Sequence, residues 1–495
     1  MRLLAIAAAG SIDPQINYTQ QFWQVFAPVY DGLVAFRKVP GPEGAQIVPD
    51  LADAVPTPQD GRIYRFHLRP GLRFSNGAPV RGTDVVASFR RIFRVGSPTQ
   101  ETFYGGIEGA SACIASPARC DLPGVRADGD AITITLVQPD PEFLQKLALP
   151  HASILPADAP PYDVGTLSLP GTGPWRIAHY DPNDALVLER NPHFKEWNPE
   201  AQPDAYADAV RYEFGLSGEA QVTAILNDQA DWIFDVPPAD RLPELAAHPA
   251  LLHLDRADAL WFVPLNVHLP PFDDIRARRA FAMAVDRAVA VRLMGGRGMA
   301  TPLCQVVPPG MPGHVPYCPY PHDLAAARRL VAESGTAGQP VTLVTDDGAT
   351  SRALGTYLVE VLGDIGYRAR LQTLSAAIQF TYIQNTDNRV QASLTGWYAD
   401  YPSARTIIAG NFGCAAFRLG SGSSTNIPGF CDPALDTLLA TGTPQAVAAV
   451  DRAITDQVPA IVLFSPRAID VTARRLDGFV SHEVYRFLFQ RAWVQ

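Results

Sequence analysis

The segment QPVTLVTDDGATSRALGTYLVEVLGDIGYRARLQTL, residues 339–374, contains a strand pattern, a helix pattern and a second strand pattern in succession. Residues 339–347 and 368–374 are typical of strands, and residues 349–367 are typical of a helix. A strand, a helix and a strand in this order favour a parallel pair joined by a right-handed crossover. The segment therefore predicts an α/β fold.

Similar patterns extend from this unit in both directions along the chain. Residues 62–68 and 392–402 have strand character, and residues 270–294 predict one long amphipathic helix. The remaining predicted elements are a first buried strand over 2–9, strands at 209–214, 230–235 and 259–267, a helix at 219–228, and strand-like pieces at 460–467 and 468–475. Strands and helices thus alternate over much of the chain, which agrees with an α/β fold.

Length and composition limit the class of protein. The chain has 495 residues, which suggests two to four domains. Apolar residues make up 47% and charged residues 18%, so a mainly disordered chain is excluded. No apolar run reaches the roughly 18 residues that a membrane-spanning helix needs. The net charge is -10 with only three lysines, so a nucleic-acid-binding role is not expected.

Six cysteines form three close pairs along the sequence, Cys113 with Cys120, Cys304 with Cys318 and Cys414 with Cys431. Six cysteines allow 15 pairings, and the short spacings favour the local one. No C-x₂₋₄-C zinc knuckle occurs. We expect three disulfides that close surface loops, which require an oxidising compartment. Six buried, reduced thiols in a cytosolic protein are the alternative.

The amino terminus, MRLLAIAAAG, is too short for a secretory signal, which needs about 15–30 residues. We therefore interpret it as the first strand and expect that a natural export signal has been removed or lies upstream of Met1.

Catalytic signatures are absent from the sequence. It has no G-x-x-x-x-G-K-[ST], G-x-S-x-G or H-E-x-x-H motif. The histidines are scattered, and Asp273-Asp274 stands at a predicted helix start, where carboxylates stabilise the helix dipole. We predict neither catalytic residues nor a cofactor or metal site.

Eight motifs follow one another along nearly the whole chain. They are SIDPQ (11–15), VYDGLV (29–34), IVPDLADA (47–54), DGRIYRFHLRPGLRFSNGAPVRGTDVVASF (60–89), GTGPW (171–175), LERNPHF (188–194), PLNVHLPPFDDIRARRAFAMAVDR (264–287) and TGWYADYP (395–402). In this order they resemble the family 5 extracytoplasmic solute-binding proteins of ABC importers, which include dipeptide and oligopeptide receptors. The cysteine pairs resemble those of a disulfide-rich subset of this family.

The resemblance implies a two-lobed periplasmic-binding-protein fold (type II, class C) with mixed sheets, hinge crossings and an extra subdomain. Lobe I would be discontinuous, the extra subdomain would pack on it, and lobe II would follow. The expected bounds are 1–35, 166–257 and 465–495 for lobe I, 36–165 for the subdomain and 258–464 for lobe II. Ligand would be enclosed between the lobes by hinge closure, without chemistry.

The resemblance also implies a ligand-binding role for the end of the TGWYADYP motif. In the peptide receptors an aspartate of this motif pairs with the α-amino group of the ligand, and Asp400 holds that position here. Capping of a turn before Tyr401-Pro402 is the alternative. Trp397 would form an apolar wall or pack in the core, and Tyr398 is a weaker candidate because alternation points it away from Trp397.

The resemblance implies further candidates for ligand binding. The loop of Asn17, Tyr18, Thr19 and Gln20 would face the ligand from lobe I. Thr172 and Gly173 stand at a crossing, either as backbone contacts or as a structural turn, and Asn266 ends a strand at another crossing. Ser403 departs from the family pattern, and no basic residue is assigned to a ligand carboxylate. Arg81, Arg405 and Arg418 are candidates in principle.

The expected function is therefore an importer receptor that captures a small solute, foremost a di- or oligopeptide. An opine, a sugar or a nickel complex is the alternative ligand, and a hydrolase on the same fold is the alternative class. The expected partners are the ligand and the permease subunits of an ABC transporter. We expect a monomer that is periplasmic or otherwise extracytoplasmic, free or lipid-anchored.

Overall fold

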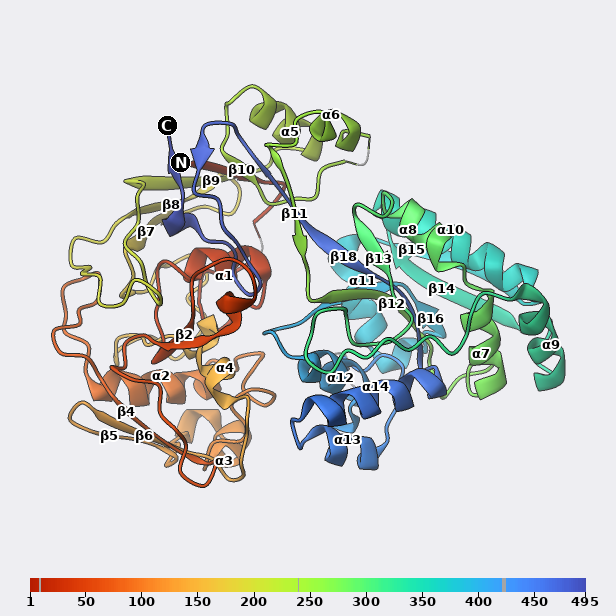
Figure 1. The fold of residues 1–495 in the computed structure, drawn as a ribbon. Coiled ribbons are helices and arrows are strands. Elements are labelled where there is room, and N and C mark those ends of the chain that lie inside the picture. The colour runs from red at the N-terminus through yellow and green to blue at the C-terminus, as the bar shows by residue number, and fades with distance from the viewer. Residues whose placement is uncertain (9, 239, 421–423) are drawn as a thin grey trace. The chain divides into compact units, whose positions relative to one another are not determined.

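The computed structural model describes residues 1–8, 10–238, 240–420 and 424–495. The chain forms two compact units: unit 1 contains residues 1–253 and 469–495, and unit 2 contains residues 254–468. The chain passes from unit 1 to unit 2 within β11 (Leu252–Arg256) and returns within β18 (Ala460–Thr472) (Figure 1). The crossings predicted from the sequence, after residue 257 and before residue 465, lie within a few residues of these points. Residues 36–165 belong to unit 1, and their division from it as an extra subdomain stays a prediction.

The sheet of unit 1 is built around β1. In this sheet the order is β18-β10-β1-β9-β8-β7, and β1 pairs in parallel with both β9 and β10. The strands are β1 (Arg2–Ala5), β7 (Trp175–Tyr180), β8 (Ala185–Arg190), β9 (Ala209–Phe214) and β10 (Trp232–Ile233). Helix α5 (Gly218–Leu226) connects β9 to β10, and its Val222 and Ile225 pack on Leu4 and Val471.

The first strand is shorter than the predicted range 2–9. It ends at Ala5, and Ile6 is 49% exposed. The residue at the end of the predicted range, Ala9, lies outside the described residues. Leu3, Leu4 and Ala5 are buried, so the first half of the run contributes to the core.

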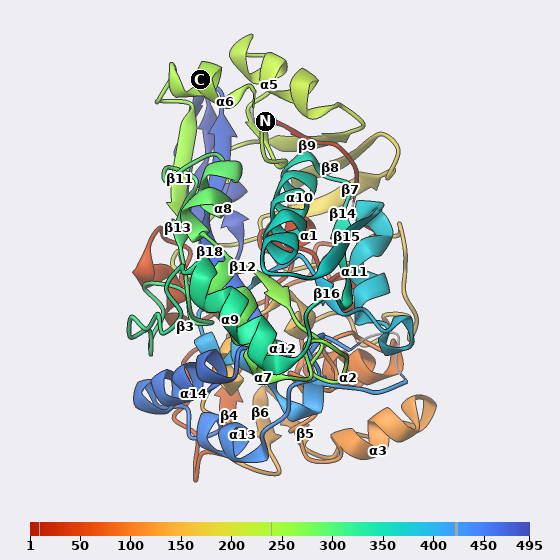
Figure 2. The ribbon, with the colours of Figure 1, turned by 90° about the vertical axis from the view of Figure 1, so that its right-hand side faces the viewer.

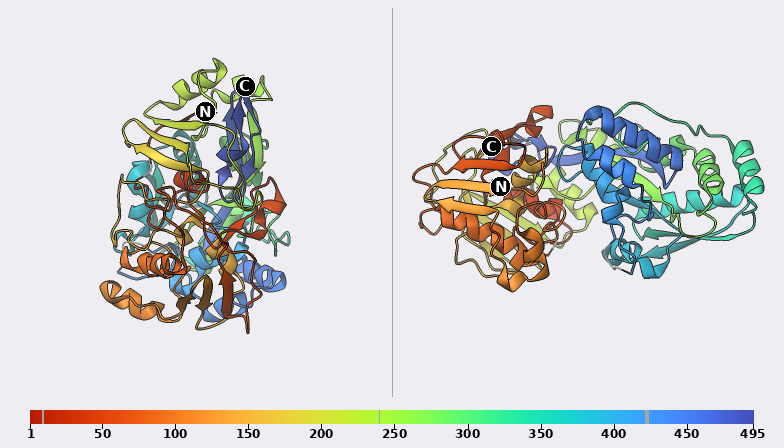
Figure 3. Two further views of the ribbon diagram at one scale, coloured as in Figure 1. Left: turned by 90° about the vertical axis from the view of Figure 1, so that its left-hand side faces the viewer. Right: turned by 90° about the horizontal axis from the view of Figure 1, so that it is seen from below.

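The rest of unit 1 combines small antiparallel sheets with short helices. Strands β4 (Ile63–His67), β5 (Val125–Asp128) and β6 (Ala131–Thr135) form one sheet, and Tyr64 and Phe66 of β4 are buried as the alternation in the sequence predicts. Residues 36–165 are drawn mainly in orange tones in Figure 3. The other elements are α1 (Gln20–Phe26), α2 (Gly82–Arg94), α3 (Ala110–Ala115), α4 (Phe143–Leu147), α6 (Leu242–Ala246), β2 (Val34–Phe36), β3 (Ile47–Pro49), β19 (Leu476–Asp477), β20 (Ser481–His482), β21 (Arg486–Phe487) and β22 (Trp493–Val494).

Unit 2 contains two sheets. In the first, β12 (Ala259–Pro264) lies between β17 (Thr395–Tyr398) and the first part of β18, and β13 (Ala300–Pro302) also pairs with β18, all antiparallel. In the second, β14 (Pro340–Asp346) pairs in parallel with β15 (Arg368–Leu374) and β16 (Ala392–Ser393). Helix α10 (Ala349–Asp364) connects β14 to β15, so the predicted β–α–β unit is confirmed.

The helices of unit 2 bury apolar faces against these sheets. Buried side chains of α10, such as Leu354 and Leu358, pack in one cluster with Leu343 of β14 and Phe281. The helices are α7 (Ile275–Ala284), α8 (Arg287–Leu293), α9 (Leu324–Ser334), α10, α11 (Ala376–Gln384), α12 (Ala404–Phe412), α13 (Pro433–Leu439) and α14 (Pro444–Gln457) (Figure 2).

The single helix predicted over 270–294 is two helices in the structure. Helix α7 ends at Ala284, and Val285 has extended backbone angles. The carboxylate of Asp286 then accepts a hydrogen bond from the amide of Ala288 at 2.8 Å and caps α8. A side-chain cap of this kind satisfies amides that an uninterrupted helix would satisfy internally, so Asp286 is a start signal inside the amphipathic pattern.

All three local cysteine pairs are disulfides. Cys113–Cys120 lies in unit 1, and Cys304–Cys318 and Cys414–Cys431 lie in unit 2. The alternative of six reduced thiols is therefore wrong.

A buried ion pair fixes the segment that precedes α1 in unit 1. The guanidinium of Arg91, on α2, donates to both carboxylate oxygens of Asp13 at 3.0 and 2.5 Å and to Gln15 Oε1 at 2.9 Å. Arg91 also donates to the carbonyls of Pro160 and Tyr162. Both charges are shielded from solvent, since the side chains are 4% and 0% exposed. The pair therefore joins three distant segments of unit 1.

We expect Arg91→Leu to lower the free energy of unfolding of unit 1 by about 3–5 kcal/mol, because the carboxylate of Asp13 would stay buried without its partner. The adjacent Arg90 on the same helix pairs with the exposed Asp121, so Arg90→Leu is the matched control and should cost under about 1 kcal/mol. Urea unfolding followed by circular dichroism measures both changes. Equal losses for the two variants would contradict the prediction.

Candidate functional site

The ten predicted ligand-binding residues are divided between the two units. Unit 1 holds Asn17, Tyr18, Thr19, Gln20, Thr172 and Gly173, and unit 2 holds Asn266, Trp397, Tyr398 and Asp400.

The loop before α1 is held by its own side chains. The side-chain Nδ2 of Asn17 donates to the carbonyl of Ser11 at 2.6 Å. Its Oδ1 accepts from the backbone amide and the hydroxyl of Thr19 at 3.0 and 2.7 Å. Thr19 caps α1 by accepting from the amide of Phe22. Asn17 is buried, whereas Tyr18 is exposed and Thr19 and Gln20 are half-buried. The loop thus presents residues 18–20 from a fixed backbone.

The ring of Tyr18 contacts three other rings. Its centroid lies 5.4 Å from His151, 5.6 Å from Trp23 and 6.2 Å from Phe103. Burial lowers the pKa of His151 to about 3, so its imidazole is neutral at physiological pH. Sequence reasoning missed these neighbours of Tyr18, because residues 103 and 151 are distant from it along the chain and carry no motif.

Thr172 and Gly173 are part of the packing of unit 1. Thr172 is 1% exposed, and its hydroxyl donates to Asp31 Oδ2 at 2.6 Å. The amide of Gly173 donates to the carbonyl of Val29, and its carbonyl accepts from the side chain of Asn191. A Cβ at Gly173 would lie 2.3 Å from the carbonyl oxygen of Pro28. These contacts agree with the structural turn that the sequence also allowed.

A buried polar network lies beneath this turn, and the sequence analysis did not identify it. Gln202 donates to Asp31 Oδ1 at 2.6 Å and accepts from Lys38 Nζ at 2.8 Å. Burial lowers the pKa of Lys38 to about 8, against the opposing effect of Asp31. Burial also raises the pKa of Asp31 and of Asp50, and for Asp50 the nearby Asp31 raises it further. The network holds the 29–34 and 171–175 motifs together.

In unit 2 the candidates Trp397, Tyr398 and Asp400 lie at the end of β17. Tyr398 pairs with Ala259 in the sheet and is 51% exposed. Trp397 is half-buried and packs against an apolar cluster that includes Ile407 and Ile408 of α12. The centroid of its ring lies 6.3 Å from that of Phe380. The amide of Ala399 donates to the carbonyl of Asp258 at 2.7 Å. Asp400, half-buried, therefore lies beside the segment that directly follows β11.

Asn266 is not brought together with Asp400. Its amide donates to the carbonyl of Gln391, at the opposite end of the paired strands β12 and β17, and its Oδ1 accepts from the amide of His268. Residues 391 and 400 are nine positions apart, a separation of roughly 30 Å in extended chain. Asn266 thus forms a turn away from the other unit 2 candidates.

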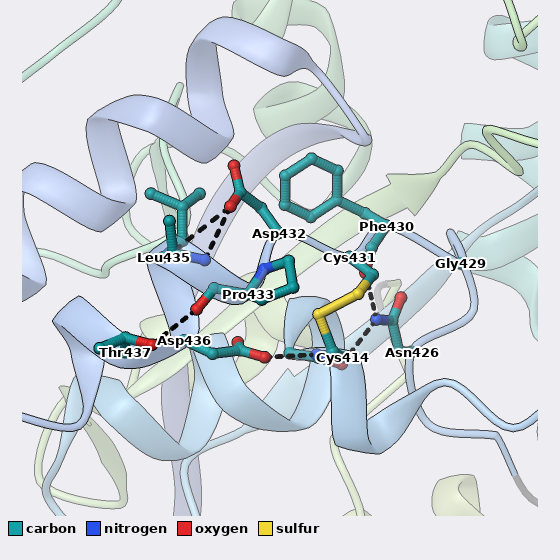
Figure 4. Close-up of a disulfide and its surroundings, with 12 residues drawn as sticks. Cys414, Asn426, Gly429, Phe430, Cys431, Asp432, Pro433, Leu435, Asp436 and Thr437 are labelled. Carbon is teal, nitrogen blue, oxygen red and sulfur yellow. Dashed lines mark hydrogen bonds between the residues drawn. A yellow bond between two sulfur atoms is a disulfide. The ribbon is translucent and has the colours of Figure 1, made fainter.

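Helix α12 begins at Ala404, four residues after Asp400, and is fixed at both ends. Ser403 caps its start by accepting from the amide of Arg405 at 3.2 Å. At its end the Cys414–Cys431 disulfide joins it to α13, the amide of Cys414 donates to Asp436 at 3.0 Å, and Asn426 donates to the carbonyls of Gly413 and Phe430 (Figure 4). The backbone that follows Asp400 is therefore held by a covalent bond and four hydrogen bonds.

The three arginines considered for a ligand carboxylate lie in different places. Arg405 is half-buried in the first turn of α12, five residues after Asp400. Arg418 is exposed inside the loop that the Cys414–Cys431 disulfide closes, and Arg81 precedes α2 in unit 1. Within its unit, Arg405 is thus the candidate nearest in sequence to Asp400.

Among the described residues, no group of three or more histidine, cysteine, aspartate or glutamate side chains could hold a metal ion. None of the helices in the described part of the chain has the length and apolar character to cross a membrane.

Comparison with known proteins shows the same family as the motifs. Residues 46–418 match the family model described as "Bacterial extracellular solute-binding proteins, family 5 Middle". The chain is 25% identical over 480 residues to the probable di/tripeptide-binding protein 5 of Pseudomonas aeruginosa (strain UCBPP-PA14), covering 91% of this chain and 87% of that protein.

Two solved structures share the fold over the whole chain. The clavulanic acid biosynthesis oligopeptide binding protein 2 superposes with a TM-score of 0.88 at 23% identity, covering 100% of this chain and 95% of the other. The ABC transporter-associated periplasmic binding protein DppA from Helicobacter pylori, in complex with the peptide STSA, has a TM-score of 0.82 at 19% identity, with 100% and 98% covered. The predicted periplasmic-binding-protein fold is confirmed.

We expect the double substitution Cys414→Ala and Cys431→Ala to increase amide hydrogen exchange over residues 404–439, because the end of α12 would lose its covalent link to α13. Hydrogen exchange read by mass spectrometry checks this. Cys113→Ala with Cys120→Ala, in unit 1, is the matched control and should leave exchange in 404–439 unchanged. Unaltered exchange in the first variant would show that the disulfide does not hold α12.

Proposed function

The chain belongs to the bacterial extracellular solute-binding proteins of family 5, and on this premise we propose that it captures di- or oligopeptides outside the cytoplasm and delivers them to the permease subunits of an ABC importer. The receptor acts by binding alone. It is periplasmic or lipid-anchored and works as a monomer.

The peptide assignment is supported by what the similar proteins bind. The Pseudomonas protein is named for di- and tripeptides, and the Helicobacter structure holds a peptide. The order of the motifs in this chain supports the same class of ligand. The alternative ligands are an opine, a sugar or a nickel complex. A thermal-shift screen distinguishes them from peptides.

One observation carries the proposed site: Asp400 lies two residues after the end of β17, beside the segment where the chain has just entered unit 2. A carboxylate there can accept charge-assisted hydrogen bonds from a protonated α-amino group. Trp397 and Tyr398 are the last residues of β17, and Tyr398 offers an exposed ring. In unit 1 the proposed contacts are Tyr18, Thr19 and Gln20, and Asn17, which is buried and bonded to Ser11 and Thr19, positions them.

Thr172, Gly173 and Asn266 are left out of the proposed site. The hydroxyl of Thr172 is already bonded to Asp31, and Gly173 is closed in by the backbone of residues 28 and 29. Asn266 forms its own turn at the far end of the strand pair. The burial of Thr172 and Gly173 and the local hydrogen bonds of all three residues account for them without a ligand.

We expect Asp400→Asn to weaken the binding of peptides with a free amino group by about 10- to 150-fold, because a neutral amide cannot replace the carboxylate of a charge-assisted hydrogen bond. N-acetylated peptides should bind wild type and variant equally weakly. Isothermal titration calorimetry with Ala-Ala, Ala-Phe and their N-acetyl forms measures these affinities. Asp273→Asn, which removes an exposed carboxylate of unit 2 outside the site, is the control.

A loss of less than twofold in Asp400→Asn would remove this residue from the site. If a thermal-shift screen shows stabilisation by an opine, a sugar or a nickel complex and by no peptide, the peptide assignment fails while the receptor role stands.

Hinge closure around the ligand stays a prediction. We expect saturating ligand to reduce the radius of gyration measured by small-angle X-ray scattering, because hinge motion is the usual response of such receptors. An unchanged radius would count against closure.

A further inference from the structure

The rings of Tyr18, Trp23, Phe103 and His151 form a cluster in unit 1 that we call the aromatic platform. Tyr18 is 40% exposed, whereas Trp23, Phe103 and His151 are 6%, 7% and 0% exposed. Three of the rings are therefore interior, and Tyr18 is the member of the cluster that solvent reaches.

The platform is held rigidly by contacts from several segments. Tyr18 meets His151 and Phe103 edge to face, at interplanar angles of 70° and 76°. Trp23 meets His151 at 76° and donates through its indole N–H to the carbonyl of Asn17 at 3.3 Å. Edge-to-face pairs at these distances are favourable geometries for aromatic side chains. Tyr18 is thus oriented before any ligand arrives.

His151 is the unusual member of the cluster. It is fully buried, and neither ring nitrogen has a hydrogen-bond partner among the described residues. A buried imidazole without partners is costly unless its N–H meets an aromatic face, and the rings of Tyr18 and Trp23 lie around it at suitable angles. The buried imidazole of His151 thus packs edge to face against the exposed ring of Tyr18.

The backbone around the platform is anchored by the buried ion pair of unit 1. Gln15 donates to the carbonyls of Ser88 and His151, at 2.9 and 3.4 Å, and accepts from Arg91. The loop that carries Tyr18 and the segment that carries His151 therefore share one support. An exposed ring on such a rigid base loses little conformational freedom when it contacts a ligand.

We propose that the aromatic platform is a side-chain subsite of the receptor and that Tyr18 contacts an apolar or aromatic side chain of the bound peptide. This inference rests on the proposed peptide-binding function and adds the class of side chain that is preferred. An aspartate or glutamate side chain placed against the ring of Tyr18 would give up water without gaining a hydrogen bond, so peptides that place one there bind less tightly.

The test compares dipeptides that differ in one side chain: Ala-Phe, Ala-Leu, Ala-Gly and Ala-Asp, together with the reversed pairs Phe-Ala and Leu-Ala. We expect wild type to bind one of the Phe or Leu peptides more tightly than Ala-Gly. Tyr18→Ala should weaken that peptide by about 5- to 20-fold and change Ala-Gly by less than twofold. Tyr18→Phe should keep the preference, because the ring and not the hydroxyl carries it.

Tyr206 provides the matched control. It is an exposed tyrosine of unit 1 whose ring packs edge to face on Trp493, at 5.2 Å between centroids, outside the platform. Tyr206→Ala should leave every affinity unchanged. Calorimetry measures the affinities, and circular dichroism confirms that each variant is folded.

The outcomes separate this inference from the proposed function. If wild type binds the peptides and Tyr18→Ala weakens all of them equally or none of them, the subsite is refuted while peptide binding stands. If wild type binds no peptide, both the proposed function and the subsite are refuted. A selective loss for the Phe or Leu peptide alone supports the subsite.

Discussion

The backbone hydrogen bonds of β18 join strands that are far apart in the sequence. Its last residues pair with β10 in unit 1, at Trp232↔Thr472 and Ile233↔Val471, and its first residues pair with β12 and β13 in unit 2. A strand with both of its edges paired cannot shift register without moving every buried side chain to the other face. The positions of β12, of its partner β17 and therefore of Asp400 depend on this one strand.

Trp397 and Tyr398 are held by the pairing of β17 with β12. The other candidates of the proposed site lie outside the paired strands and are positioned by polar and covalent contacts. In unit 1 the Arg91–Asp13 pair and the bonds of Asn17 and Thr19 fix the loop before α1. In unit 2 the cap at Ser403 and the Cys414–Cys431 disulfide fix the helix that follows Asp400. A binding site must keep its shape without ligand to avoid paying the full ordering entropy on binding, and these contacts provide that shape.

Local patterns predicted most elements and failed where a single side chain or a distant partner intervened. The β–α–β unit at 339–374 follows the prediction, because its periodicity is long and uninterrupted. The helix over 270–294 divides at Asp286, since a capping carboxylate competes with the amphipathic pattern. The two strand-like pieces after residue 460 are one strand through Pro466, because β13 pairs with β18 at that point.

The fold class, the family resemblance, the pairing of the cysteines and the motif that contains Asp400 can all be read from the amino-acid sequence. They depend on periodicity, spacing and motif order, which are properties of residues close together in the chain. The structure was needed to show that Thr172 is bonded to Asp31, that Asn266 lies at the far end of a strand pair from Asp400, and that His151 packs against Tyr18. Those contacts form between residues far apart in the chain, and they are selected by the packing of whole elements, for which one sequence has no local signal.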